Sequence, residues 1–457
     1  MASAVEQVFR YAQPSSVGIL DGHADVRLAT SGGVSTRGLV DHPRFFDGFL
    51  DHAEQMATAL LAVARVARTR FYVPPSMLAA VLRAADPVVT SNGDRLRFES
   101  FSACCGVYAR LDVLPDALDG PALDTGTTNV DFNPPMRQAL AGIGGFEPLH
   151  LSVGRDVTVT TLEDSVTEKR VPLSERWFKG FAEVQVAAST MVQVLEIPAV
   201  DARRFVQSLP RATGTRTRTA MLWAVPAGRG LRLTGRAGPG AVCLAGPERL
   251  RVLEPLLRFG SALRAYAPAV ATSGAPSASV WELELQGARL SVTLSPEVSR
   301  GFSGEGGVLR DLADPATSGD SDRISALLAF EPRLDVADLA RRAGIDEARV
   351  LRAIGRLGAA GRVGFDAREG AYFSRALPYD ATALEGMHPR LRDARALIEQ
   401  GAVRLDGELA YVGTEEPRHV VRRTPAGHRC SCPWYGRHQD NRGPCKHVLA
   451  VELVRHR

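Results

Sequence analysis

The pattern of apolar and polar positions changes along the chain, and it first predicts two α+β domains, at residues 1–152 and 153–302. In the first, "DHAEQMATALLAVARVARTR" has helical periodicity, whereas "PVVTSNGDRLRFESF" contains two strand-like runs around Asn92-Gly93, a strong hairpin signal. In the second, "TAMLWAVPAGRGLRLT" and "SVWELELQGARLSVTL" are typical of hairpins. Helical stretches separate these hairpins, and one is expected over "PERLRVLEPLLRFGSALRAY".

A cleaner pattern follows a stretch rich in Gly, Ser and Asp that is predicted to be a linker at residues 303–320. Three short helical runs are expected there, "SDRISALLAF", "DVADLARRAG" and "DEARVLRAIGRLGAAG", and then two strands around a turn at Arg368-Glu369-Gly370. This order is similar to a winged helix-turn-helix, which we predict over residues 321–380.

The third helical run carries a candidate nucleic-acid contact. Its apolar side is predicted to face the core and consists of Val350, Leu351, Ile354 and Leu357. Another side carries three aligned arginines, which suit phosphate and base-edge contacts in a major groove: Arg349, Arg352 and Arg356. A solvated face, or a module for protein docking, would carry the same arginines, and both alternatives stay open.

Composition places the chain among soluble globular proteins, with 457 residues, 45% hydrophobic and 23% charged. The first residues lack the pattern of a signal peptide, and no apolar run reaches the roughly 18 residues that a membrane span needs. We therefore expect a cytoplasmic protein. Six cysteines are too few for a disulfide framework, and in a reducing compartment a cluster of cysteines suggests metal binding.

Three of the six cysteines and four of the ten histidines fall in the last 30 residues. They form a C-x-C-x12-C-x-H motif, and three thiolates with one imidazole satisfy tetrahedral Zn²⁺. The predicted ligands are Cys430, Cys432, Cys445 and His447, with His428 and His438 as competing candidates. Four protein ligands leave no position for a catalytic water, so the predicted site holds one structural zinc ion.

The motif resembles the SWIM zinc finger, in which a C-x-C pair, a variable loop and a C-x-H pair follow one another. The resemblance covers about residues 405–457, including a hairpin that turns at Pro425-Ala426-Gly427 and a helix after His447. We assign this finger to a domain at residues 385–457. SWIM fingers are generally taken to bind DNA or proteins, so the resemblance implies a binding module rather than a reaction.

The tail is also basic, with nine Lys or Arg between Pro417 and Arg457 against Asp440 and Glu452, whereas the whole chain has a net charge of only +4. Its candidate phosphate-binding residues are Arg422, Arg423, Arg429 and Arg442. The N-terminal 300 residues contain "FESFSACCGVYARLDVLPDALDG" and "GTTNVDFNPPMR". With these stretches they resemble bacterial proteins that end in this finger. That resemblance implies protein partners, among them an AAA-type ATPase or a von Willebrand A-type protein.

Catalytic signals are weak in this sequence. "ALDTGTTNVDF" has an aspartic-protease triplet and a likeness to an actin-like phosphate loop, but the context that each needs is missing, and we predict a polar turn. The expected function is therefore that of a non-enzymatic, zinc-binding DNA-binding or regulatory protein. The alternatives are an adaptor for an ATPase-containing complex, and an enzyme of unknown class in the N-terminal region.

Overall fold

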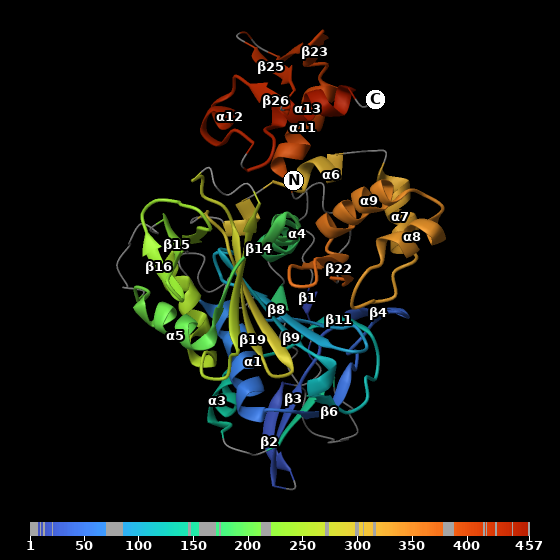
Figure 1. The fold of residues 1–457 in the computed structure, drawn as a ribbon. Helices are drawn as coiled ribbons and strands as arrows, with labels where there is room; N and C mark the ends of the chain where they lie inside the picture. Colours follow the sequence, from blue (N-terminus) through green and yellow to red (C-terminus); the bar gives the residue numbers. More distant parts are fainter. Residues whose placement is uncertain are drawn as a thin grey trace.

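The structure is a computed structural model, and Figure 1 gives its fold. It describes most of the chain, namely residues 8–9, 11, 14–20, 22–69, 86–144, 148–154, 171–172, 175–211, 221–269, 274–297, 301–304, 306–313, 317–377, 388–414, 416, 418–425, 427–440 and 442–455.

A ten-stranded antiparallel sheet is the centre of the molecule. Its strands, in spatial order, are β14 (Met191–Pro198), β18 (Ala262–Pro268), β19 (Ser279–Leu285), β20 (Ala288–Leu294), β9 (Val107–Val113), β8 (Leu96–Phe101), β7 (Val88–Ser91), β11 (Gly126–Asn129), β4 (Gly33–Ser35) and β5 (Gly38–Val40). The first four lie in the range 153–302 and the other six in the range 1–152. The pairing of β20 with β9 therefore joins these two ranges in one sheet.

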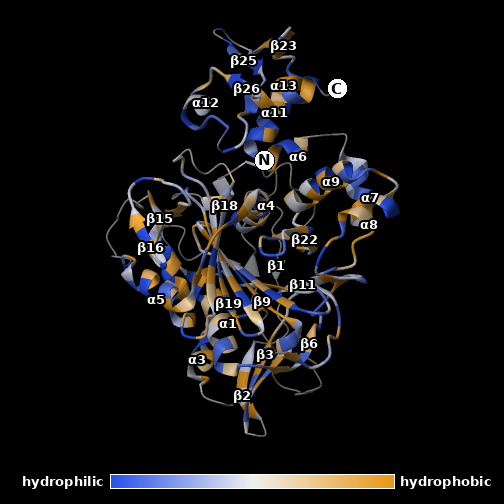
Figure 2. Ribbon diagram, viewed as in Figure 1, coloured by the Kyte–Doolittle hydropathy of each residue, from blue (hydrophilic) through white to orange (hydrophobic). Residues whose placement is uncertain are grey.

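Alternation along the strands gives this sheet two different buried faces. Leu96, Phe98 and Leu111 point to an apolar face, which packs against helix α1 (Ala53–Arg68) in the largest core cluster. Figure 2 shows apolar residues concentrated in α1 and in nearby strands such as β19. The opposite face carries charged residues of β8 and β9, and helix α4 (Glu175–Ser189) packs there through a cluster of aromatic rings.

Smaller elements complete the N-terminal part. A five-stranded sheet has the order β10 (Leu118–Asp119), β6 (Phe46–Leu50), β12 (Leu149–Val153), β3 (His23–Leu28) and β2 (Ser16–Leu20). A three-stranded sheet contains β16 (Gly230–Thr234), β15 (Met221–Ala227) and β17 (Val242–Ala245). Other elements are α3 (Pro134–Gly142), α5 (Ala199–Ser208), the 3₁₀ segments η2 (Pro115–Ala117), η3 (Pro247–Leu256) and η5 (Gly301–Gly304), and the short pair β1 (Val8–Phe9) and β13 (Val171–Pro172).

Several local predictions are confirmed and two are wrong. The hairpin around Asn92-Gly93 is β7–β8, and the two hairpins quoted from the second range are β15–β16 and β19–β20. The helix expected over residues 247–266 is instead the 3₁₀ segment η3, which contains Pro255, followed by strand β18. The polar turn expected in "DTGTTN" is strand β11, in which Thr127 and Thr128 are buried.

Residues 303–377, predicted as a linker followed by a winged helix, form helices in both parts. Within the range predicted as a linker, α6 (Leu309–Ala313) buries Leu309 and Leu312. Then come α7 (Ser318–Ser325), α8 (Val336–Ala343), α9 (Glu347–Ala359) and the hairpin β21 (Val363–Asp366) and β22 (Ala371–Ser374). Between α8 and α9 the chain turns at Gly344, whose φ of +65° lies in the left-handed region and ends α8. The domain boundaries themselves stay predictions.

The core face predicted for α9 is correct at three of its four positions. Val350, Ile354 and Leu357 are buried in one cluster with α7 and α8. Leu351 was placed on that face wrongly, since it is 47% exposed. One residue past Val350, its side chain rotates by about 100° and out of the core.

The C-terminal segment lies at one end of the molecule (Figure 1). It consists of α11 (Pro389–Glu399), a four-stranded antiparallel sheet and two further helices, with the sheet in the order β23 (Val403–Asp406), β24 (Leu409–Val412), β25 (His419–Thr424) and β26 (Gly427–Cys430), and the helices α12 (Pro433–His438) and α13 (Lys446–Arg455). Helix α13 packs across all four strands. The predicted hairpin is β25–β26, and the two strands before it were not predicted.

Candidate metal centre and nucleic-acid interface

The four predicted zinc ligands come together from three local structures. Cys430 ends β26, Cys432 is the N-cap of α12, and Cys445 and His447 stand at the start of α13. One ligand atom of each residue lies within 4.8 Å of all the others, and all four residues are buried. Among the described residues this is the one such group of metal-ligating side chains.

Distances and hydrogen bonds within the group fit tetrahedral zinc. Cys430 Sγ lies 3.7 Å from Nδ1 of His447, close to the separation of about 3.6 Å that usual Zn–S and Zn–N bond lengths give. The backbone amide of Tyr435 donates to Cys432 Sγ at 3.4 Å, and that of Val448 donates to Cys445 Sγ at 3.5 Å. Such donors stabilise thiolate charge and orient the ligands. The four residues are placed to bind one zinc ion.

The thiols differ in how readily they give up a proton. A hydrogen bond from Cys430 lowers the pKa of Cys445 to about 4, with His447 and the amide of Val448 acting in the same direction. Burial raises the pKa of Cys432. Because zinc binds thiolates, metal binding must displace the remaining thiol protons, and affinity for zinc falls as the solution becomes more acidic.

The two competing histidines have other contacts. Nδ1 of His428 lies 3.1 Å from a carboxylate oxygen of Glu452, and the ring of His438 lies 4.3 Å from that of Trp434. Neither belongs to the group of close ligand atoms. A histidine that the sequence did not single out, His419, lies against the ligand ring of His447 at 4.3 Å between centroids.

Comparison with known families agrees with this geometry. The family model described as "SWIM zinc finger" matches residues 419–456. This segment is a SWIM zinc finger. The match covers both ligand pairs, the β25–β26 hairpin and α13, and it leaves the rest of the chain unmatched. No curated protein matches the chain.

Solved structures are similar over part of the chain. One of them is the crystal structure of Proliferating Cellular Nuclear Antigen from Entamoeba histolytica, at 6% sequence identity and a TM-score of 0.31, covering 56% of this chain and 100% of that one. Similarity this low carries no argument about fold or function. None of the helices in the described ranges combines the length and the apolar character needed to cross a bilayer.

Of the four arginines predicted as phosphate contacts in the SWIM finger, three lie at its surface. Arg422 and Arg423 on β25 and Arg429 on β26 are exposed, and Arg422 stands directly opposite Arg429 in the sheet. Arg442 is different. Its guanidinium lies 2.9 Å from Glu297 and donates to the carbonyl of Gly304 at 2.7 Å, so it connects the finger to the rest of the protein.

The three arginines of α9 also differ in how far contacts within the protein engage them. Arg349 makes a two-bond ion pair with Asp320 on α7, at 2.9 and 2.7 Å, and Arg356 donates to the carbonyl of Leu312 at 2.9 Å. Arg352 is exposed, and no hydrogen bond or ion pair holds it among the described residues. Of the three arginines that helical periodicity aligns, Arg352 is therefore the one that is available to a ligand.

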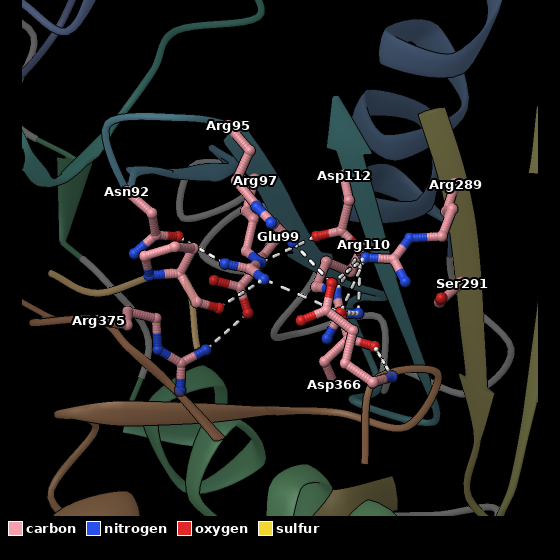
Figure 3. A network of polar contacts seen from close by, with 12 residues as sticks. Asn92, Arg95, Arg97, Glu99, Arg110, Asp112, Arg289, Ser291, Asp366 and Arg375 are labelled. Atoms are coloured by element: carbon pink, nitrogen blue, oxygen red, sulfur yellow. Dashed lines mark hydrogen bonds and ion pairs between the residues drawn. The ribbon is translucent and has the colours of Figure 1, made fainter. Parts of the chain in front are cut away.

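A second polar cluster, which the sequence did not reveal, is buried between the charged face of the large sheet and the β21–β22 hairpin (Figure 3). Asp366 at the end of β21 lies 3.1 Å from Arg110 and 3.0 Å from Arg289. Burial by itself would raise the pKa of Asp366, but Arg110, Arg289 and Arg97 outweigh it and hold that pKa well below its usual range.

Further contacts of this cluster attach the hairpin to the sheet. Arg375, directly after β22, pairs with Glu99 at 2.6 Å, Asn92 donates to the carbonyl of Ser374 at 2.9 Å, and Arg110 donates to the carbonyl of Phe365 at 2.8 Å. Perturbed titration can mark an active site, but structural ion-pair networks perturb it as well. Here the perturbed carboxylate of Asp366 is enclosed by arginines, and the cluster serves to dock the hairpin.

Proposed function

We propose that the protein is a non-enzymatic, zinc-dependent nucleic-acid-binding protein with a regulatory role, and that the SWIM finger presents its main binding surface. The carrying observation is the exposed hairpin with Arg422, Arg423 and Arg429, whose last residue is the zinc ligand Cys430. Because β26 ends in a ligand, zinc holds these cations in a fixed arrangement. Fixed cations suit a phosphate backbone.

We also infer a winged helix-turn-helix in residues 321–380, with a secondary part in binding. Three helices and a hairpin in this order support the assignment. In the usual arrangement the third helix enters the major groove. Here Arg352 on α9 is exposed, whereas the hairpin packs on the large sheet through Asp366. The winged helix would therefore add one helix face rather than a complete docking surface.

Fluorescence anisotropy tests this proposal. The zinc-loaded protein should bind labelled DNA at low salt, and log K should fall against log salt with a slope of about −3 to −4 if four arginines neutralise phosphates. Removing zinc should weaken binding, because the tail keeps its charge but loses its geometry. No binding to any DNA at low salt, or binding that is indifferent to zinc, contradicts the proposal.

An adaptor role is the second candidate, and two observations favour it. Arg349 and Arg356 are engaged within the protein, and the neighbouring Leu351 exposes an apolar side chain on α9. A partner of the AAA-type ATPase or von Willebrand A class would then dock on this helix. Co-purification that depends on Leu351 and not on zinc would support the adaptor. We also propose a cytoplasmic location, since none of the six cysteines, all within the described residues, forms a disulfide.

A further inference from the structure

The outward face of the finger's sheet is a basic surface with one aromatic ring. Val421, Ala410 and Val412 point inward and are buried in the finger core under α13. Alternation then sends their neighbours outward. The strand register places these outward residues in two rows, Arg404–Tyr411–Val420 and Asp406–Leu409–Arg422–Arg429. We call this set the outer face of the finger.

The outer face is open. Arg404, Arg422 and Arg429 are exposed, and among the described residues none of them has an ion-pair partner. In Figure 1, strands β23 and β25 lie at the end of the molecule, with α11 and α13 between them and the other domains. Asp406 is the acidic residue of the two rows, and it lies at the edge strand beside a turn. The outer face therefore has a net positive charge.

Two features of the outer face suit an incoming ligand. Arg422 and Arg429 are directly opposite each other, and like charges in that position destabilise a sheet unless an anion lies between them. Tyr411 is partly exposed and lies diagonally beside Arg422, with the guanidinium of Arg404 5.0 Å from its ring centroid. A phosphate between the two arginines and a base on the tyrosine ring would satisfy both features.

We infer that the outer face binds single-stranded nucleic acid, with a phosphate held between Arg422 and Arg429 and an unpaired base stacked on Tyr411. This inference rests on the proposed function and narrows its ligand. Exposed rings on a basic sheet are suited to single strands, because every unpaired base offers a face for stacking. Bases of a duplex are already stacked on one another, so an isolated tyrosine on a flat sheet has little to bind there. A duplex is the competing ligand.

The test compares a labelled oligothymidine with a duplex of the same length, using the zinc-loaded full-length protein. The single strand should bind more tightly, and log K should fall against log salt with a slope of about −2, as three arginines on a single strand require. Tyr411→Leu should weaken single-strand binding about 5- to 150-fold, whereas Tyr411→Phe, which keeps the ring, should retain it. Crosslinking of an iodouracil-substituted strand should map to Tyr411.

Two arginine variants show whether the face or the bulk charge matters. Arg422 and Arg423 are neighbours on β25 but point to opposite faces, so Arg422→Gln should weaken binding more than Arg423→Gln. Arg204→Gln on α5, 77% exposed and remote from the finger, is the charge-matched control with no expected effect. Zinc content and thermal unfolding of each variant should match the parent, which excludes misfolding.

Each outcome decides a different question. Equal losses from Arg422→Gln and Arg423→Gln, or indifference to Tyr411→Leu, overturn the outer face as the site. Tighter binding to the duplex also overturns this inference, but it leaves the proposed nucleic-acid-binding function in place. Absence of binding to both ligands overturns the inference and the proposed function together.

Discussion

Individual ligand residues determine whether the metal centre binds zinc. Cys430 and Cys445 come from the two ligand pairs, and their replacement removes two of the three thiolates. Metal analysis after dialysis should find about one equivalent of zinc in the parent and none in a Cys430→Ser, Cys445→Ser double variant. Cys243→Ser alters a buried thiol of β17 and should keep the metal. A full equivalent in the double variant would contradict the ligand assignment.

The charged residue Asp366 offers a contrasting prediction about stability. Asp366→Asn removes a carboxylate shared by three buried arginines, Arg97, Arg110 and Arg289, and leaves their charge less fully compensated. Breaking a buried pair typically costs about 3–5 kcal/mol. Asp338→Asn on α8 is the control, since its ion pairs with Arg341 and Arg342 are exposed and should contribute less than about 1 kcal/mol. Urea unfolding and hydrogen exchange of the β21–β22 hairpin measure both. Equal effects would mean that the cluster does not dock the hairpin.

Acid should also lower the stability of the parent protein, because it protonates Asp366. The pKa of Asp366 is depressed in the folded protein, so its contribution is present above the unfolded carboxylate value of about 4 and is lost as the pH falls below it.

Residue-level prediction from the sequence succeeded where neighbours in the chain are also neighbours in space. The zinc ligands lie within 18 positions, so spacing alone identified them. Arg97, Arg110 and Asp112 were missed because alternation assigns charged strand residues to solvent. Nothing local indicates that a hairpin 255 residues after Arg110 will cover them. Arg442 was assigned to nucleic acid for the same reason, since its partner Glu297 is distant in the sequence.

At the scale of elements, α11 has a built-in sensitivity to acid. His388 precedes this helix and is 5% exposed, and among the described residues its Nε2 has no hydrogen-bond partner. Burial, with Lys179 and Arg390 nearby, lowers its pKa to about 4. The unfolded chain therefore binds a proton at higher pH than the folded protein does. Stability from this residue is complete above about pH 6.5 and is lost as the pH falls towards 4.

The shifted pKa of His388 predicts how much stability the protein loses in mild acid. Between pH 7.5 and pH 5.5 the parent should lose about 1.4 kcal/mol through His388, and His388→Gln should lack this component. Zinc ligands also titrate in acid, so the difference between parent and variant is the quantity to measure, by urea unfolding at both pH values. Identical pH dependence in the two proteins would show that His388 is hydrated and titrates normally.

Element prediction depended on how strong the local pattern was. Helices α1, α5, α8 and α9 and the hairpins were predictable, because periodicity and turn residues act over a few positions. Strand β18 was mistaken for helix because it is buried on both faces and has no alternation. Strand β11 was mistaken for a turn because its threonines are polar, yet Thr127 and Thr128 find buried partners in Thr90, Ala376 and Ser31.

At the scale of the whole molecule, the SWIM finger is docked rather than suspended. Leu449 and Ala450 of α13 enter a core cluster with Leu309 and Leu312 of α6 and Leu391 of α11. Arg442 supplies the polar contacts to residues 297 and 304. A Cβ atom at Gly443 would collide with the carbonyl oxygen of Gly306, so the two backbones lie in direct contact. The loop between the ligand pairs is therefore part of the interface.

Zinc should consequently stabilise both the finger and its docking surface. Chelation frees the loop that carries Arg442 and Gly443, and it releases the start of α13, so hydrogen exchange should rise in residues 419–455 and also in residues 306–313. Strands β8, β9 and β20 belong to the large sheet, and their amides should stay protected from exchange. Arg442→Gln provides the matched variant. It keeps all four ligands and should retain one equivalent of zinc, yet it should raise exchange in residues 301–313 alone. Unchanged exchange in residues 306–313 after chelation would mean that zinc holds only the finger, and that docking depends on apolar packing that survives without the metal.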